Sequence, residues 1–253
     1  GGYWLASRAF ELSELKLLVD AVQSSRVIAK TTSDRLIAKL EGLASQYEAS
    51  QLQRQVYVDG RPKTANKELP YSVDALFTAI NGGRMVQFRY KKAGRPNLKT
   101  ISPWQMAWEN GCYYLIAYQD EKEPVGIRHY RVDRMAGITV LDEPRRGKEQ
   151  FAGFDLPAYL KKHFNMYGGD EYRVTLRCTA DLEPAMRERF GSGPIFLPEG
   201  EEHFHFDVPI CVSDQFYGWV CGFGGKVEIT APVKVREGLR EMTARIAAAH
   251  QNV

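Results

Sequence analysis

The sequence predicts an α+β fold with an N-terminal helical segment, a central small β-barrel of the SH3-like or Sm-like kind, and a C-terminal α+β domain of ferredoxin-like character. Apolar residues recur at helical spacing near the N-terminus, short strands with tight turns fill the centre, and a strand–helix–strand–helix pattern follows. We divide the chain into residues 1–83, a helical and dimerising segment, residues 84–143, the barrel, residues 144–169, a linker, and residues 170–253, the C-terminal domain.

The composition is that of an ordinary globular protein. With 253 residues, 44% hydrophobic and 26% charged, the chain can form two or three compact units at roughly 100–150 residues per domain. No apolar run approaches the ~20 residues of a transmembrane helix, and the N-terminus lacks the layout of a secretion signal, so we expect a cytoplasmic protein with no membrane partner. The four cysteines lack metal-ligand spacing, so we expect them to be reduced, buried and structural.

Two amphipathic helices are expected first. One spans about residues 11–24, with its apolar stripe at Leu12, Leu15, Leu18, Val19 and Val22. The second begins where Thr31–Asp34 offer N-cap oxygens. These stripes must pack on each other, on the barrel or across a subunit interface, and we expect a homodimer.

A connector follows, with a strand-like Gln55–Val58 and a polar linker that contains Lys63. It leads to a short helix with Ser72 as its N-cap and Asn81–Gly83 as its stop.

The central unit is predicted from alternating strands over residues 86–90, 98–104, 112–118, 127–133 and 137–141, with a turn at Glu109–Gly111. Successive strand side chains point to opposite faces. Tyr113 and Leu115 therefore share one face, which we expect to be core, while Tyr114 lies on the other, which is free to carry a site.

The positive charge is concentrated on this unit. Residues 84–146 hold eight Arg and four Lys against seven acids, a net charge of +5, whereas the whole chain has +3. The excess of arginine favours forked recognition of phosphate or carboxylate, although a solvated basic face is the alternative.

Two motifs carry a family resemblance. Gly111-Cys112-Tyr113-Tyr114-Leu115, followed by Tyr130-Arg131-Val132-Asp133-Arg134-Met135, resembles the WYL domain, with Tyr113 where the family usually has Trp. Residues 2–25 resemble the segment after the winged helix-turn-helix of WYL-containing transcription regulators, and residues 172–250 resemble their C-terminal extension. The resemblance implies a bacterial regulator whose domain for duplex DNA lies upstream of residue 1.

The resemblance places ligand contacts on residues that match Arg131 and Arg134, our strongest candidates. The alternative for Arg134 is a surface ion pair with Asp133 or Glu143. Tyr114 could stack on a nucleobase beside these arginines or simply fill the barrel. Further candidates for the same surface are Arg128, Arg89 and Ser102, although a strand hydroxyl is the more ordinary role for Ser102.

The sequence therefore predicts a region that senses a small anionic effector or a single-stranded nucleic acid through a Tyr/Arg pocket. The alternative is an accessory module that binds RNA or DNA constitutively through an Sm-like surface. We expect neither an enzyme nor a cofactor, because the chain has no phosphate loop and no nucleophile elbow. His203 and His205 could face one side of a strand, but a third ligand is lacking, so no metal site is predicted.

Overall fold

The computed structural model describes residues 10–45, 48–49, 52, 63–91, 96–120 and 125–250. The expected strand Gln55–Val58 and the first part of the N-terminal segment, residues 2–9, lie outside these residues. The chain divides into two compact units, Gly1–Gln150 and Phe151–Val253. Within the described ranges, no helix is long and apolar enough to cross a bilayer.

The first unit begins with two helices that pack on each other, α1 (Leu12–Ser24) and α2 (Lys30–Glu41). The predicted α1 is confirmed, and a capping box between Glu11 and Glu14 starts it. The predicted N-cap of α2 is wrong, because the helix begins at Lys30 and contains Thr31–Asp34. Ser33 is buried instead, and its hydroxyl donates to the carbonyl of Val22 on α1 at 3.4 Å.

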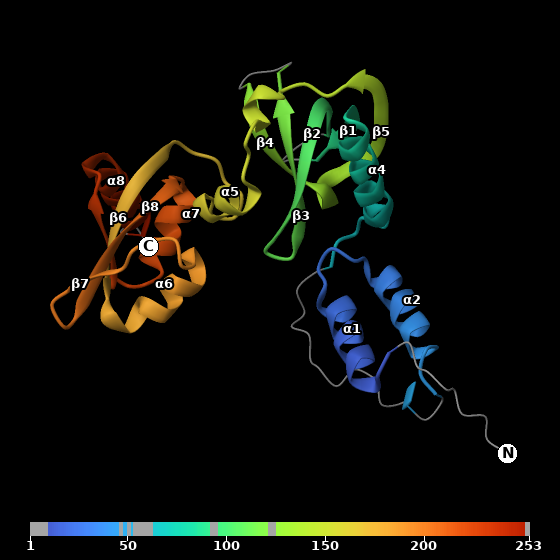
Figure 1. Ribbon diagram of the computed structural model, residues 1–253, viewed down its shortest axis with the longest axis horizontal. Coiled ribbons are helices and arrows are strands. Elements are labelled where there is room, and N and C mark those ends of the chain that lie inside the picture. Colours follow the sequence, from blue (N-terminus) through green and yellow to red (C-terminus); the bar gives the residue numbers. More distant parts are fainter. Residues whose placement is uncertain are drawn as a thin grey trace. The chain divides into compact units, whose positions relative to one another are not determined.

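A five-stranded antiparallel sheet forms the centre of the first unit (Figure 1). Its strands lie in the order β4-β3-β2-β1-β5, with pairing between all neighbours. Their bounds are Arg84–Tyr90 for β1, Asn97–Glu109 for β2, Cys112–Gln119 for β3, Gly126–Arg131 for β4 and Met135–Pro144 for β5. The predicted α+β class is confirmed.

The sheet does not close into a barrel through strand pairing among the described residues, because β4 and β5 are its outer strands. It is nevertheless strongly curled. Arg131 ends β4 and Met135 begins β5 beside β1, and four steps of chain reach at most about 14 Å. The specific Sm-like barrel stays a prediction.

The predicted strand over residues 127–133 extends too far. It ends at Arg131, and Val132–Arg134 form a 3-10 helix, η1. The physical reason is the crossing from one edge of the sheet to the other, which requires the chain to turn at this point. Val132 and Met135, at either end of the turn, are buried in the core and anchor it there.

Helix α4 (Leu69–Gly82) covers the sheet and contacts β5, β1 and β2. It begins after Glu68, so the predicted N-cap Ser72 is wrong: Ser72 lies inside the helix and is buried. The predicted stop is confirmed, with Gly83 as the C-cap. The apolar core between helix and sheet contains Leu76, Ala79, Val86, Phe88, Ile101, Leu115 and Tyr130.

A short strap after β5, Arg145–Gly147, is fastened to the sheet. The Arg145 guanidinium lies 3.7 Å from the centre of the Trp104 ring, whose Nε1 donates to the carbonyl of Arg146 at 2.8 Å. The Arg146 amide donates to Ser102 Oγ at 2.8 Å. A Cβ on Gly147 would lie 2.3 Å from the Tyr118 ring, so the strap passes close to β3.

The second unit contains a four-stranded antiparallel sheet in the order β7-β8-β6-β9. Its elements are α5 (Leu156–Lys162), β6 (Glu171–Thr179), α6 (Glu183–Phe190), β7 (Leu197–Glu199), β8 (His203–Cys211), α7 (Asp214–Cys221), β9 (Val227–Ala231) and α8 (Val233–His250). Apolar residues of the sheet pack with α6, α7 and α8 in one aromatic-rich core. The expected ferredoxin-like arrangement stays a prediction.

The cysteines follow the expectation with one exception. Cys112, Cys178 and Cys211 are buried, whereas Cys221 at the end of α7 is exposed, so its predicted burial is wrong. All four are free thiols. Burial raises the pKa of the Cys178 thiol to about 12, which makes it unreactive at neutral pH.

Candidate ligand-binding site

An aromatic cluster supports the end of β4. The rings of Phe88, Tyr90 and Tyr130 meet edge to face, with centroids 5.2–6.1 Å apart. The Tyr130 hydroxyl donates to Gln119 Oε1 at 2.7 Å, and the Tyr90 hydroxyl accepts the backbone N–H of Arg131 at 3.1 Å. The backbone that carries Arg131 is therefore held by a rigid base.

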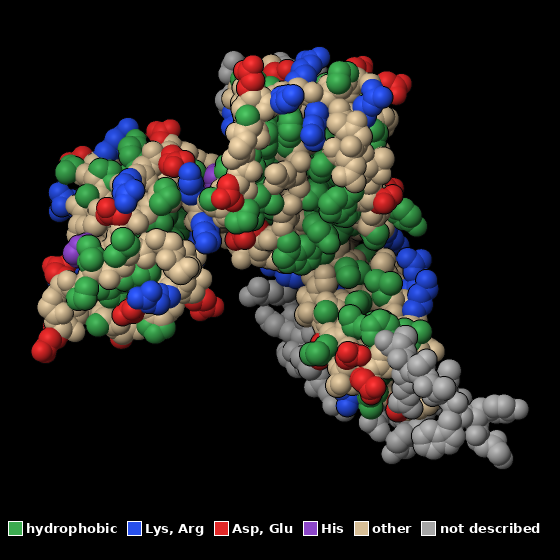
Figure 2. All heavy atoms as spheres, viewed as in Figure 1, with side chains coloured by type: hydrophobic (Ala, Val, Ile, Leu, Met, Phe, Trp, Pro, Cys, Tyr) green, Lys and Arg blue, Asp and Glu red, His purple; other side chains and the backbone are tan. Residues whose placement is uncertain are grey.

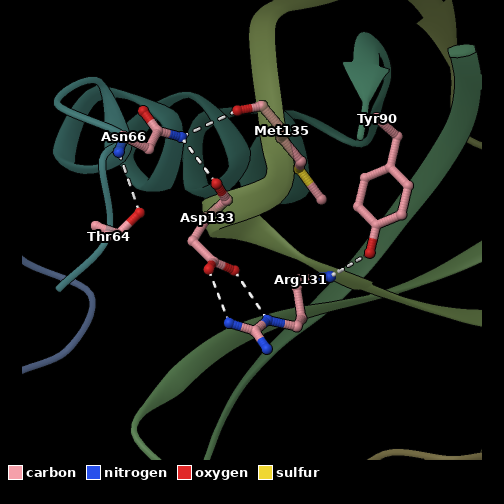
Figure 3. Close-up of polar contacts among 6 residues, drawn as sticks. All are labelled: Thr64, Asn66, Tyr90, Arg131, Asp133 and Met135. Atoms are coloured by element: carbon pink, nitrogen blue, oxygen red, sulfur yellow. Dashed lines mark hydrogen bonds and ion pairs between the residues drawn. The ribbon is translucent and has the colours of Figure 1, made fainter. Parts of the chain in front are cut away.

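Arg131 forms a forked ion pair with Asp133 (Figure 3). Its Nε donates to Oδ1 at 3.0 Å and its Nη2 donates to Oδ2 at 2.8 Å. The hydrogen bonds to this carboxylate raise the pKa of Arg131 above its usual range. The pair fixes the plane of the guanidinium, and Nη1 points away from the carboxylate.

Tyr114 lies directly opposite Arg131, its partner in the pairing of β3 with β4. The side chains of paired residues point to the same face. Burial raises the pKa of the Tyr114 hydroxyl, and the nearby positive charges of Arg131 and Arg134 oppose that rise. Tyr114 therefore stays a neutral phenol next to two guanidinium groups.

Arg134 is the last residue of η1 and is exposed. Its backbone carbonyl accepts the N–H of Lys91 at 3.0 Å, which ties the turn to the end of β1. Asp133, proposed as its surface partner, pairs instead with Arg131. The structure thus brings Tyr114, Arg131 and Arg134 together around η1.

The other candidates lie elsewhere. Arg128 is three residues from Arg131 on β4, so the two side chains start on opposite faces, and Arg128 lies near the Tyr130 hydroxyl. Arg89 is exposed on β1, on the face opposite Phe88. Ser102 is fully buried, and its oxygen accepts the Arg146 amide of the strap.

The predicted division of β3 into a core face and a site face holds only in part. Leu115 and Ala117 are fully buried, as expected for the core face, and Tyr113 is half-buried against Trp108. Ile116, on the other face, is also fully buried. The expectation of a free second face is therefore wrong at the middle of the strand, whereas Tyr114 remains half-buried.

Asn66 is a residue that supports the η1 turn from outside the binding site, and sequence reasoning missed it. Its Nδ2 donates to the carbonyl of Asp133 at 3.2 Å and to that of Met135 at 3.0 Å, so it holds both ends of the turn (Figure 3). The sequence offers only a local signal, a turn before α4 in which Asn66 Oδ1 accepts the amide of Glu68.

The basic residues of the first unit are spread over its surface. In the face shown in Figure 2, Lys and Arg side chains gather over the upper ends of β4, β2 and β1, and apolar side chains lie over the lower part. The positive field is therefore broader than the turn around η1. Among the described residues, no group of three His, Cys, Asp or Glu side chains could hold a metal ion.

Comparison with known families accounts for both units. The WYL domain matches residues 72–140 and the WCX domain matches residues 170–247, together more than half of the chain. The chain belongs to the WYL-domain family of transcription regulators. The WYL match contains β3, β4 and η1, and therefore Tyr114, Arg131 and Arg134.

Curated relatives of this WYL-domain chain are similar over almost its whole length. The protein PafB of Mycobacterium tuberculosis is 22% identical over 258 residues, which cover 98% of this chain and 76% of the relative. PafB of Mycobacterium bovis gives the same values.

Two solved structures are also similar to the WYL-domain chain. Proteasome accessory factor B/C (PafBC) of Arthrobacter aurescens is 20% identical with a TM-score of 0.35, and the match covers 96% of this chain but only 36% of that one. A crystal structure of a CRISPR Cas-related protein is 13% identical with a TM-score of 0.45, over 97% of this chain and 75% of that chain.

Proposed function

We propose that this region of a WYL-domain regulator senses a nucleotide-like anion or a short single-stranded nucleic acid at Tyr114, Arg131 and Arg134. The main observation in support is the cross-strand pair of Tyr114 and Arg131, in which a neutral aromatic ring lies beside a guanidinium of fixed orientation. Bases of any sequence can stack on aromatic rings, and arginine recognises phosphate through its forked donors.

The ion pair with Asp133 limits the side from which a phosphate can approach Arg131. It occupies the Nε and Nη2 edge of Arg131, so an incoming phosphate would meet the Nη1 side of the guanidinium. Arg134 is exposed at the end of the turn and adds a charge that Asp133 does not pair. In this arrangement Asp133 orients one arginine and the second arginine supplies the net attraction.

Further expectations belong to the same proposal. We infer a homodimer, because α1 exposes Leu17 at 71% and Leu18 at 37% of their surface. We also infer that a domain for duplex DNA precedes the sensing region in the full regulator, and that the ligand is bound without being chemically changed.

The test is a titration of the purified chain with a fluorescent ten-nucleotide oligothymidylate and with nucleoside triphosphates at several salt concentrations. Arg131→Ala should weaken oligonucleotide binding by about tenfold or more, as loss of one charged hydrogen-bonding partner costs about 1.5–3 kcal/mol. Tyr114→Leu should weaken it by a comparable factor, whereas Tyr114→Phe, which keeps the ring, should have a small effect.

The matched control is Arg35→Ala, which removes one positive charge from the exposed surface of α2. If the oligonucleotide were bound only by general electrostatic attraction, Arg35→Ala and Arg131→Ala would reduce its affinity equally and would reduce the salt dependence of binding equally. That result would overturn the proposed site. Binding of triphosphates alone would identify the small anion as the ligand class.

A further inference from the structure

We propose that residues 63–66 mechanically couple the η1 turn of the ligand site to the helical pair α1–α2, with Asn66 holding the turn and Lys63 holding the helices. This inference rests on the proposed function, since it names the route by which a ligand at η1 would be communicated. Residues 63–66 contact both parts, and their short length limits slack, because three chain steps reach at most about 11 Å.

Asn66 forms hydrogen bonds with the backbone of the η1 turn. Its amide nitrogen donates to the carbonyls of Asp133 and Met135, and its amide oxygen accepts the N–H of Glu68 at 2.9 Å. These partners fix the orientation of the amide, because carbonyls can only accept and an N–H can only donate. Asp133 is thus held through its backbone by Asn66 and through its side chain by Arg131.

Lys63 forms hydrogen bonds with both helices. Its ammonium donates to the carbonyl of Val22 on α1 at 3.2 Å and to Ser33 Oγ on α2 at 2.6 Å. Burial lowers the pKa of Lys63, which is consistent with a partly desolvated contact. Between Lys63 and the Asn66 side chain, the backbone N–H of Thr64 donates to the carbonyl of Arg26 at 2.8 Å. The backbone N–H of Asn66 donates to Thr64 Oγ1 at 3.1 Å.

The helical pair has a second attachment to the sheet. Val27, between the two helices, is buried in the core cluster of the sheet. Val132 of η1 and Met135 lie in the same cluster, so this apolar contact is a second connection between the helices and the turn. The polar contacts of residues 63–66 join the helices to Asp133, the residue that pairs with Arg131. Any ligand that redirects Arg131 or Asp133 therefore acts on the same short segment that fastens α1 to α2.

Coupling of this kind is reciprocal: if a ligand at η1 changes the stability of the α1–α2 contact, loosening that contact changes the affinity for the ligand by the same factor. Hydrogen–deuterium exchange of the intact chain, with and without the ten-nucleotide oligothymidylate, tests whether the ligand changes the α1–α2 contact. The readout is exchange in Leu12–Ser24 and Lys30–Glu41. In the wild type, saturating oligonucleotide should change this exchange by threefold or more.

Asn66→Ala should still bind the oligonucleotide, within about tenfold of wild type, but should lose the response in α1 and α2. The matched control is Asn81→Ala, at an exposed position of α4, which should keep the full response. Lys63→Met tests the other end and should shift oligonucleotide affinity at least threefold, whereas Lys39→Met, exposed on α2, should not. A full response in Asn66→Ala, or equal affinity in Lys63→Met and Lys39→Met, would overturn the coupling.

A ligand-free measurement separates this inference from the proposed function. Asn66→Ala and Lys63→Met should each raise exchange in α1 and α2, and the double variant should raise it by less than the product of the single effects. Independent contacts would give the simple product. If wild type binds no oligonucleotide or nucleotide, the proposed function fails, and this ligand-free comparison alone decides the coupling.

Discussion

The two units of the molecule place their polar groups differently. In the first unit, Ser33, Ser72, Ser102 and Gln119 are buried, whereas His163 is the buried polar residue of the second unit within the described part of the chain. The second unit instead fills its core with apolar and aromatic side chains. Packing dominates the second unit, whereas the first depends in addition on hydrogen bonds that require specific partners.

Two arginine–carboxylate pairs, one from each unit, differ in exposure. In the first unit, the Arg131 and Asp133 side chains are 28% and 15% exposed and form two hydrogen bonds. In the second, Arg173 pairs with Asp207 on the open face of the sheet, with side chains 77% and 44% exposed. The same chemistry should orient a functional group in one place and contribute little in the other. Four predictions test this difference, in order of decreasing effect.

Removing one ring from the second core should give the largest effect. Phe206 is 1% exposed and packs against Phe190 and Phe196, with centroids 5.4 and 4.7 Å away. Phe206→Ala should lower the free energy of unfolding of this unit by about 3–5 kcal/mol, because the cavity cannot fully collapse. Hydrogen exchange of the β6 and β8 amides measures it, and a loss below about 1 kcal/mol would show that the core is loosely packed.

The buried hydroxyl of the first unit should appear as a sensitivity to alkaline pH. Burial raises the pKa of Tyr130 to about 12, whereas an unfolded tyrosine ionises near ~10. Between these values the unfolded chain releases a proton that the folded chain retains, so stability falls as the pH rises, by up to about 2–3 kcal/mol near pH ~12.

The measurement is urea unfolding followed by circular dichroism at several pH values from neutral to alkaline, for wild type and Tyr130→Phe. The variant should lose stability at neutral pH, by about 1 kcal/mol for the hydrogen bond to Gln119, and should show a shallower alkaline decline. Identical alkaline declines in the two proteins would contradict the assignment of this effect to Tyr130.

Breaking the half-buried pair should give an intermediate effect. Asp133→Ala leaves the Arg131 guanidinium without its carboxylate, and loss of charged hydrogen bonds of this kind costs about 1.5–3 kcal/mol. Hydrogen exchange of the β3 and β4 amides reports the opening of this region. An unchanged exchange rate would mean that Arg131 finds equivalent partners in water and is not held in place.

Breaking the exposed pair should give the smallest effect. Arg173→Ala should change the stability of the second unit by less than about 0.5 kcal/mol, because water and salt already compete with the interaction. The same exchange experiment on β6 and β8 measures it. A loss as large as that of Asp133→Ala would remove the distinction between the two pairs.

The elements set by local pattern were predictable from sequence. The periodicity of α1 and the alternation of β3 depend on neighbouring residues. The register that pairs Tyr114 with Arg131 was not predicted, because adjacency of two strands alone does not fix their register. The predicted N-caps failed because α2 and α4 begin earlier, at Lys30 and Leu69, so that Ser33 and Ser72 lie buried inside the helices.

Two other features depended on the complete fold. Residues 132–134 turn because β5 pairs with β1 across the curled sheet, a long-range constraint that alternation does not contain. The contact of Asn66 with the η1 turn could not be predicted because its two carbonyl partners lie 67 and 69 residues later in the chain. Its role exists only after the sheet and the turn have formed.

Strand β2 has a consequence for the order of folding. Its first part pairs with β1 and its second part with β3, with an irregularity between Pro103 and Gln105. The β2–β3 hairpin closes through Asn110 and Gly111, both with positive φ, so its contacts are local, whereas Arg84 meets Pro144 only after sixty residues. Local contacts form fastest. We therefore expect assembly from this hairpin outward, with β5 joining last, and pulse-labelling exchange during refolding should protect the Tyr114 amide before those of β5.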